Sequence, residues 1–316
     1  MAERRTFFAP GRVNLIGEYT DLVGGLVLPV AIQLGITLSG EAAEETTLTS
    51  DAHTAGWERY VEAVECELRE VGRPDVGVRG SLTATLPIGA GLSSSAALEV
   101  AVGLALCAAA DFPLAPFELA KLARRAERRA VGVPSGILDQ AASLLGRKEH
   151  ALLLDTGTLE YEHVTMPPEL VVIVVHSGVE RRLEDTAYAT RKREIEEGDP
   201  KRLRHIVSEN ERVLAAADAL RRDDRTELGR LFRESHASLR EDLEVSVPEL
   251  DEIVDCAYAL GAVGARLTGG GFGGSAVVLA DSGSAASIAG AFSRSIVCAA
   301  SDGARELSAP TQVARS

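Results

Sequence analysis

The sequence is poor in aromatic residues and in positive charge. Phe, Tyr and Trp make up 4% of its 316 residues, so a core of the size this length allows must be built from alanine, valine and leucine. The formal net charge is −14 at pH 7. Nucleic acids and anionic membranes are bound mainly by cationic surfaces, so neither is expected as a general partner. A single anion held in a locally favourable pocket is not excluded.

Metal-ligand spacings and long apolar runs are also missing. The four cysteines and six histidines are scattered, and neither set has the spacing of metal ligands. Such isolated cysteines are typical of reduced core residues in a cytoplasmic protein. The N-terminal residues lack the apolar segment of a signal peptide. The longest apolar run, residues 96–110, contains Glu99 and is too short to span a bilayer. We expect a cytoplasmic protein of one large or two smaller domains, and the sequence leaves its oligomeric state open.

The periodicity of apolar residues predicts alternating strands and helices. Strands and turns are expected over residues 6–40, and further strands over residues 80–86, 151–154 and 170–175. Helices are expected over residues 58–71, 98–110, 117–130, 183–197, 205–222, 227–242, 248–260 and 285–299. Pro167 and Pro168 predict a joint between an N-terminal domain, residues 1–166, and a C-terminal domain, residues 167–316.

Five glycines stand within six residues at 269–274, with the sequence GGGFGG. Such a density is tolerated where the backbone adopts positive φ repeatedly or passes very close to another group. The apolar residues 275–279 follow directly, so the run predicts a loop that leads into a strand. A tight hairpin or a bulge is the alternative to a ligand-binding loop.

A second glycine-rich segment, residues 87–97, has the sequence PIGAGLSSSAA and precedes a buried helix. Backbone N–H groups, serine hydroxyls and the positive end of a helix together suit a phosphate. The segment lacks the Gly-Lys-Ser/Thr of the Walker motif and the third glycine of the dinucleotide fingerprint. The alternative is an ordinary helix with serine N-caps.

A third segment, residues 10–21, has the sequence PGRVNLIGEYTD. Arg12, Glu18 and Asp21 interrupt an apolar, strand-like pattern, and each is costly to bury without a partner. These charges therefore either form a structural cluster of ion pairs or line a polar pocket.

In chain order, the motifs at residues 10–21, 87–97 and 269–274 together resemble the GHMP kinase superfamily. The motif at residues 10–21 is similar to the galactokinase signature. The segments that carry the resemblance to galactokinases are residues 11–21, 136–140, 176–179, 188–194 and 235–251, and the similarity extends from about residue 6 to about residue 281. The resemblance implies an α+β, two-domain GHMP kinase fold. Its N-terminal domain is ribosomal-S5-like, its C-terminal domain is ferredoxin-like, and the active site lies between them.

The resemblance also implies that the protein uses ATP and Mg²⁺. The residues implied for the nucleotide are Trp57 near the adenine, Gly89, Gly91, Leu92, Ser93, Ser94 and Ser95 in the serine-glycine loop, and Gly270 and Gly271. Ser95 and Glu127 are the implied Mg²⁺ ligands. Two alternatives stay open, because Trp57 can be an ordinary core residue and Glu127 a surface carboxylate among arginines.

The implied reaction is phosphoryl transfer to the anomeric hydroxyl of a small-molecule sugar. This needs an oriented hydroxyl and neutralised charge on the transferring group, for which Asp139 and Arg12 are the candidates. The residues implied at the sugar are Glu18, Tyr19, Asp21, Gly136, Asp139 and Leu243. For Asp139, a helix N-cap after Gly136 is the alternative.

The chain departs from the galactokinase pattern at the sugar. Tyr19 stands where the family has histidine, residues 22–23 (Leu-Val) where it has tyrosine-asparagine, and Leu243 where it has tyrosine. These changes predict that galactose is accepted without strong preference over L-arabinose or an N-acetylated amino sugar. Two other functions stay open: a GHMP kinase for another small alcohol, and a catalytically silent sugar sensor of the same fold.

Overall fold

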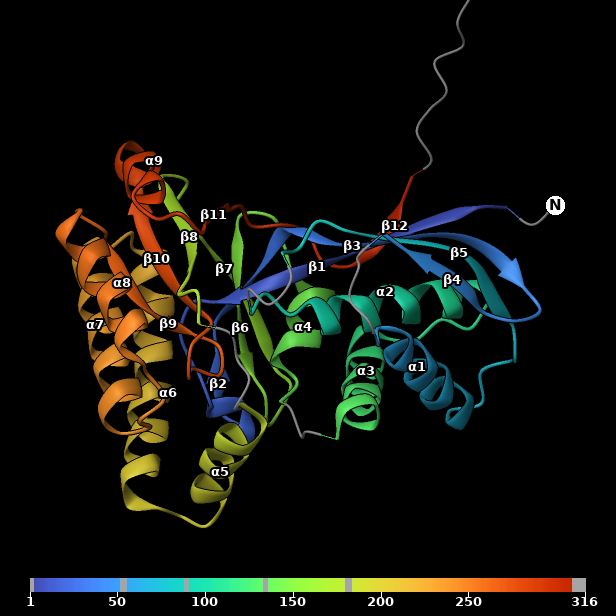
Figure 1. The fold of residues 1–316 in the computed structure, drawn as a ribbon, viewed down its shortest axis with the longest axis horizontal. Coiled ribbons are helices and arrows are strands. Elements are labelled where there is room, and N and C mark those ends of the chain that lie inside the picture. The colour runs from blue at the N-terminus through green and yellow to red at the C-terminus, as the bar shows by residue number, and fades with distance from the viewer. Residues whose placement is uncertain (1–2, 52–55, 88–90, 133–135, 180–183, 309–316) are drawn as a thin grey trace, which may run out of the picture.

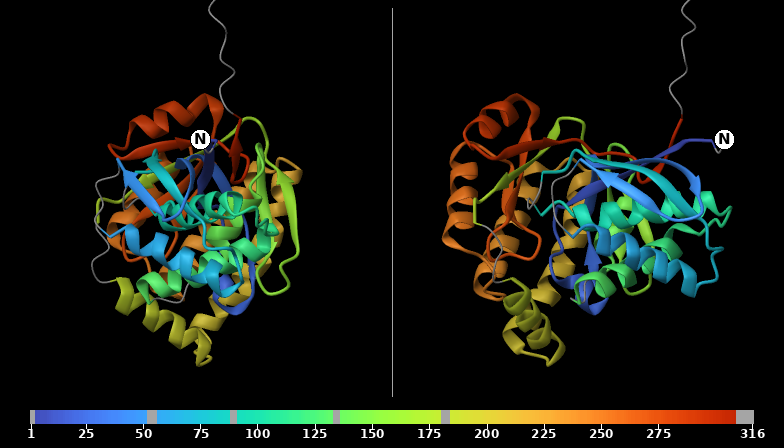
Figure 2. Two further views of the ribbon diagram at one scale, coloured as in Figure 1. Left: turned by 90° about the vertical axis from the view of Figure 1, so that its right-hand side faces the viewer. Right: turned by 45° about the vertical axis from the view of Figure 1, so that its right-hand side comes forward.

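The computed structural model describes residues 3–51, 56–87, 91–132, 136–179 and 184–308. Two mixed lobes of strands and helices lie side by side, and the N-terminal half of the chain builds most of the right-hand lobe in Figure 1. The views in Figure 2 show the same two lobes from other sides. None of the helices in the described ranges is long and apolar enough to cross a membrane.

A five-stranded sheet forms the N-terminal lobe, with the order β12-β1-β3-β5-β4 and one parallel pair, β4 with β5. Its strands are β1 (Arg5–Asn14), β3 (Pro29–Ala43), β4 (Thr47–Ser50), β5 (Gly77–Ala84) and β12 (Arg305–Leu307). Four helices pack with it: α1 (Glu58–Glu70), α2 (Ser94–Ala109), α3 (Pro116–Val131) and α4 (Leu138–Leu145). Helix α2 contacts both β1 and β3, and α1 and α3 pack against α2 (Figure 1). The residues just before α2 lie at β1, because the Arg12 N–H donates to the Leu92 carbonyl at 3.2 Å.

The C-terminal lobe contains a fully antiparallel sheet with the order β11-β8-β10-β9. Its strands are β8 (Leu170–His176), β9 (Gly264–Thr268), β10 (Ser275–Asp281) and β11 (Ser295–Cys298). The helices of this half are α5 (Glu184–Glu196), α6 (Pro200–Arg221), α7 (Arg225–Glu241), α8 (Pro248–Ala259) and α9 (Ser282–Gly290). A small sheet of β2 (Leu26–Val27), β6 (His150–Asp155) and β7 (Tyr161–Thr165) and the short helix η1 (Thr20–Val23) complete the described fold.

Most predicted elements are confirmed within a few residues, but the last predicted helix is wrong. Residues 285–299 are not one helix, because α9 ends at Gly290 and β11 follows. Ile296 and Val297 are β-branched and pair with Val174 and Ile173 of β8. The edge of this sheet thus overrides the local helical pattern. Strand β12 was also not predicted, since its pairing with β1 joins residues about 300 positions apart. The domain boundary at residues 166 and 167 stays a prediction.

Both cores are aliphatic, as the scarcity of aromatic residues predicts. Helix α2 is the clearest case, because Ala97, Val100 and Ala101 are all completely buried. The cysteines do not all follow the prediction of core positions, since Cys256 is exposed and Cys66 is partly exposed. All four are free thiols.

A buried ion-pair cluster joins the two lobes. Arg266 of β9 is completely buried, donates to the Leu15 carbonyl at 2.9 Å and pairs with Glu209 of α6 at 3.4 Å. Glu209 in turn accepts the Gly17 N–H at 3.0 Å. Burial alone would raise the pKa of Glu209, but Arg266 and its neighbours His205 and Arg212 hold that pKa at about 2. The chain after β1 is therefore anchored to the C-terminal lobe.

Candidate active site

The serine-glycine loop ends in a helix start that leaves its backbone donors available. Gly91 has φ +71° and Ser93, the N-cap of α2, has φ +59°. Ser93 makes no side-chain capping bond, and its hydroxyl donates to Asp139 instead. The alternative of an ordinary serine-capped helix is therefore wrong. An uncapped N-terminus with its positive dipole end is a ready anion site.

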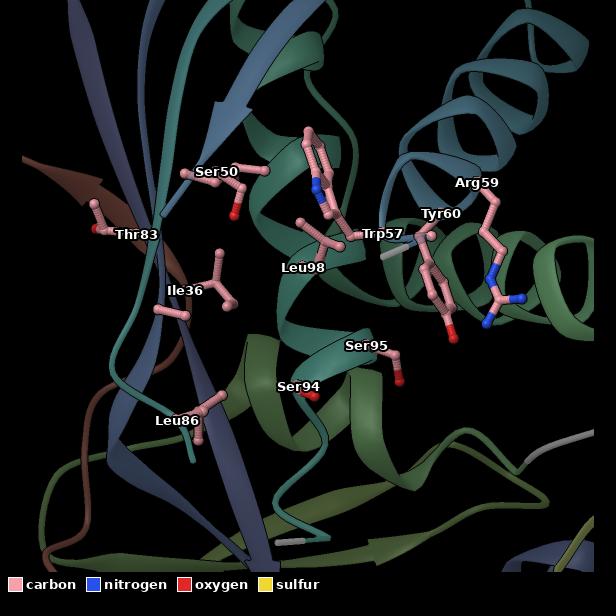
Figure 3. A pocket seen from close by; sticks show the side chains of 13 residues that line it. Ile36, Ser50, Trp57, Arg59, Tyr60, Thr83, Leu86, Ser94, Ser95 and Leu98 are labelled. Carbon is pink, nitrogen blue, oxygen red and sulfur yellow. The ribbon is translucent and has the colours of Figure 1, made fainter. Parts of the chain in front are cut away.

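An apolar pocket of about 240 Å³ opens at this helix start. We call it the aromatic pocket, because Trp57 and Tyr60 lie among its lining residues (Figure 3). Ser94 and Ser95 line its other end (Figure 3). A ligand that carries both a flat ring and phosphates could bind with the ring near Trp57. Its phosphates would then point to the start of α2. Trp57 is partly buried and packs at the edge of the core, so the structure gives it both a packing contact and a place on this pocket.

A second pocket, of about 120 Å³, lies between the two lobes, and we call it the polar pocket. Most of the predicted sugar and catalytic residues line it: Arg12, Glu18, Tyr19, Asp21, Gly136 and Asp139. Five more lining residues were not assigned from the sequence: Asn14, Gly17, Leu138, Tyr188 and Gly269. Gly270, which was assigned to the nucleotide, lines this pocket as well.

Arg12 and Asp139 form an ion pair in the lining of the polar pocket. Arg12 Nε donates to Asp139 Oδ1 at 2.8 Å, and Arg12 Nη2 lies 2.6 Å from the same oxygen. Arg12 Nη1 donates to the Gly91 carbonyl at 2.8 Å, and the other Asp139 oxygen accepts the Ser93 hydroxyl. The Asp139 carboxylate is thus held by Arg12 and by the serine-glycine loop together. A hydroxyl bound in the polar pocket could lie against it.

Glu18 belongs to the buried ion-pair cluster and also lines the polar pocket. Its Oε1 accepts the Thr268 hydroxyl at 3.1 Å and the Gly269 N–H at 3.0 Å, and its Oε2 pairs with Arg266. Glu18 therefore fits both alternatives that the sequence left open, because it belongs to a structural cluster of ion pairs and also lines a polar pocket. The carboxylate holds the first glycine of the glycine-rich loop against the segment that follows β1.

Tyr19 and Asp21 line the polar pocket from the turn after β1. Tyr19 has φ +67°, its hydroxyl donates to the Gly270 carbonyl at 2.7 Å, and its ring packs on Tyr188 with centroids 5.3 Å apart. Burial raises the pKa of Asp21 to about 7, the Asp139 carboxylate adds to this rise, and Arg12 opposes it. Near neutral pH, Asp21 can therefore both accept and donate a hydrogen bond.

Some predicted site residues lie elsewhere. Leu243 is completely buried in the C-terminal core, does not line the polar pocket as described, and offers only its carbonyl to Arg191. The side chain of Leu92 is also buried in the core, and its carbonyl accepts the Arg12 N–H. A Cβ on Gly271 would lie 2.3 Å from the Val245 carbonyl oxygen, so close backbone packing explains that glycine. Gly89 lies outside the described residues.

Ser95 and Glu127 form an oxygen-only pair at the start of α2. The Ser95 hydroxyl donates to Glu127 at 3.0 Å, which places this carboxylate at the helix start and not on the arginine-rich face of α3. The described residues hold no cluster of three or more potential metal-ligating side chains. A hydroxyl and one carboxylate suit Mg²⁺, which is commonly bound through one or two carboxylates, waters and substrate phosphates. The pair therefore fits the ion that the sequence predicts.

Gln140 connects this pair to a second, deeply buried carboxyl group. Its Nε2 donates to Glu127 at 3.1 Å and to Glu99 at 3.2 Å. Glu99 is completely buried in α2, and burial, with a further contribution from Glu127, raises its pKa to about 10. Glu99 is therefore neutral in the folded protein at physiological pH.

The raised pKa predicts a pH-dependent effect of Glu99→Gln on stability. Between about pH 4.5 and pH 10 the unfolded chain releases this proton while the native state keeps it, so wild-type stability falls as the pH rises. Glutamine carries no such proton. We expect the melting temperature of the variant, relative to wild type, to rise steadily from pH 5 to pH 9. A difference that stays constant across this pH range would contradict a neutral Glu99.

Comparison with known proteins agrees with this geometry. Residues 59–147 match the family model for the GHMP kinases N terminal domain, residues 216–297 match the GHMP kinases C terminal model, and residues 2–41 match the galactokinase galactose-binding signature. Galactokinases of Thermococcus kodakarensis and Pyrococcus furiosus are each 40% identical to the chain. These alignments cover 89% of the chain and 91% of the Thermococcus protein, and 92% of both the chain and the Pyrococcus protein.

The solved structures agree as well. The crystal structure of Lactococcus lactis galactokinase complexed with galactose is 31% identical, with a TM-score of 0.91 over 96% of this chain and 95% of that one. A mevalonate kinase of L. major complexed with R-mevalonate shares the fold with a TM-score of 0.75 at 22% identity, covering 96% of this chain and 99% of that one.

Two lobes of this topology, with a polar pocket between them and matches to both GHMP kinase domain models, define a small-molecule kinase of the GHMP type. Within that class the chain belongs to the galactokinase family. It is an ATP-dependent sugar kinase, as the sequence predicted.

Proposed function

We propose that the protein transfers the γ-phosphoryl group of ATP to the anomeric hydroxyl of galactose. One observation carries the proposal: Asp139, which lines the polar pocket, is held by Arg12 and by Ser93, the residue directly before Ser94 and Ser95 of the aromatic pocket. A nucleotide in the aromatic pocket and a sugar in the polar pocket would have their reacting groups together there. The galactose-binding signature over residues 2–41 supports galactose as the sugar.

The site residues have different roles, which follow from their charge. The start of α2 binds the ATP phosphates, and Ser95 and Glu127 would hold Mg²⁺, which neutralises phosphate charge when bound. Arg12 stabilises the transferring group. Asp139 orients the sugar hydroxyl and accepts its proton. Glu18 accepts the Gly269 N–H and so holds the glycine-rich loop in place as one wall of the polar pocket.

The weak preference for galactose was predicted from Tyr19 and Leu243, and the structure removes the support for that prediction. Leu243 lies in the core, and the hydroxyl of Tyr19 is bonded to Gly270. We therefore propose galactose as the main substrate, with L-arabinose and an N-acetylated amino sugar as the competing candidates. Asp21 and Asp139 offer several acceptors in the polar pocket, which suits a polyol better than an alcohol with one hydroxyl group.

The test is ADP release over a panel of hexoses, pentoses, amino sugars and small alcohols. We expect galactose to give the highest kcat/KM, with an acid-labile product whose ³¹P–¹H coupling places the phosphate on C1. Phosphate on a primary hydroxyl would overturn the positional claim. Sugar binding without ATP turnover would instead support the silent sensor.

Gly136→Ala should weaken sugar binding selectively. A Cβ at this position would lie 1.6 Å from Asp21 Oδ2 and 2.3 Å from its Cγ, so the carboxylate must leave its place in the polar pocket. We expect KM for the sugar to rise about tenfold or more, the order of one lost hydrogen bond, with KM for ATP nearly unchanged. Gly290→Ala is the matched control, because nothing lies within 4 Å of its Cβ. An unchanged KM for the sugar would remove Asp21 from the binding site.

A further inference from the structure

The side chain of Asn14 carries a buried carboxamide whose polar atoms form no hydrogen bond within the described protein. Asn14 is the last residue of β1 and is 2% exposed, yet it lines the polar pocket. Because side chains alternate along a strand, it lies on the same face of β1 as Arg12. Its Nδ2 and its Oδ1 both lack a hydrogen-bond partner in the described protein. A buried donor and acceptor left unpaired are destabilising.

The backbone around Asn14 is satisfied, so the unpaired amide is confined to the side chain. The Asn14 carbonyl accepts the Thr268 hydroxyl at 2.9 Å, and the residue pairs with Pro29 across the sheet. The charged neighbours are already engaged, since Arg12 pairs with Asp139, and Glu18 with Arg266 and Gly269. The free donor and acceptor therefore face a pocket whose charged groups bond mainly to one another.

Asn210 shows how a structural asparagine behaves in the same protein. Its Oδ1 accepts the Leu26 N–H at 2.7 Å, and its Nδ2 donates to the Ile206 carbonyl at 2.8 Å. Both of its polar atoms thus have partners in the protein, and its Oδ1 holds the chain after β1 against α6. Asn14 lacks any such role, which argues that its partner is the bound molecule.

We propose that the Asn14 carboxamide is a sugar ligand that donates from Nδ2 to one hydroxyl and accepts at Oδ1 from its neighbour. A carboxamide carries one donor group and one acceptor side by side, which matches two hydroxyls on adjacent carbons. This inference rests on the proposed sugar-kinase function and adds a requirement for a vicinal pair. It makes Asn14 a specificity-determining residue, because a site built to bond a hydroxyl discriminates against its deoxy analogue.

The experiment compares Asn14→Leu, Asn14→Asp and the control Asn210→Leu by thermal unfolding and by calorimetric titration with galactose and with ADP. Leucine removes both unpaired atoms and keeps the branched shape of the side chain, so Asn14→Leu should keep or raise the melting temperature without ligand. Its galactose affinity should fall about tenfold or more while ADP affinity stays within twofold. Asn14→Asp, which keeps an acceptor but loses the donor, should also lose galactose affinity. Asn210→Leu should lower the melting temperature and leave galactose affinity nearly unchanged.

Monodeoxy galactoses supply a second readout that does not depend on the stability of a variant. In the wild type, removal of either of two adjacent hydroxyls should weaken binding, and Asn14→Leu should abolish the discrimination at these two positions alone. Unchanged galactose affinity in Asn14→Leu would overturn the inference. The inference would also be wrong if Asn14→Leu were destabilised or unfolded and the wild type bound all the monodeoxy galactoses without needing two adjacent hydroxyls. If the wild-type protein binds no sugar of the panel, the proposed function itself is wrong.

Discussion

Asp139→Asn should lower kcat by about 10²–10⁴, the range for a positioned acid–base group, while ATP and sugar still bind. Asparagine keeps the size of the side chain and an oxygen for Arg12, but it loses the charge and the second acceptor that now receives the Ser93 hydroxyl. The reacting hydroxyl would lose the group that orients it and accepts its proton. Single-turnover phosphorylation and separate titrations with ADP and galactose measure the two effects independently.

The control for this variant is Asp75→Asn, which alters an exposed carboxylate paired with Arg69 and should leave kcat unchanged. Retained turnover in Asp139→Asn would return Asp139 to a structural role in the first turn of α4. A loss of sugar affinity equal to the loss in kcat would show that the carboxylate binds the substrate and does not act on the reacting proton.

Arg12→Lys should lower kcat/KM by about 10²-fold or more, the scale of one lost group that stabilises charge in a transition state. Arg12 reaches the Asp139 carboxylate through Nε and Nη2 and the Gly91 carbonyl through Nη1. A lysine ammonium is a single point charge and cannot keep this forked arrangement. Steady-state kinetics with galactose and ATP, on protein whose melting temperature has been checked, measure the effect.

Arg69→Lys is the matched control, because that guanidinium is exposed and pairs only loosely with Asp75 at 3.4 Å. The double variant Arg12→Lys with Asp139→Asn should lose much less than the product of the single losses, since the two residues act as one unit. Fully additive losses, or a near-normal Arg12→Lys enzyme, would show that this ion pair is not part of the reaction.

The predicted residues fall into two groups when they are compared with the structure. Arg12, Glu18, Asp21 and Asp139 were selected because charged residues in apolar or glycine-rich surroundings need partners, and all four line the polar pocket. Leu243 was selected by its position in a motif alone, and it lies in the core. A physical reason for an individual residue was thus a better guide than its place in a resemblance.

Other features gave no local signal at all. Asn14 looks like an ordinary residue of a strand, and its unpaired carboxamide becomes visible only once its neighbours are known. Tyr188 lies about 170 positions from Tyr19, against which it packs. Strand β11 was mistaken for helix because its β8 partners lie more than 100 positions earlier in the chain.

By itself, the sequence indicated the class of fold through its resemblance to a family, and its local patterns indicated the start of α2 and the charged residues that line the polar pocket. Periodicity and the conformational needs of glycine act over a few residues, so they can be recognised locally. The tertiary structure alone decided which groups remain free to act on a ligand. Glu18 is bound to Arg266 and Gly269, and Asn14 is left unpaired, because segments some 250 residues apart close around them. Hydrogen-bond satisfaction in a buried site depends on all the elements that meet there, and no local pattern contains it.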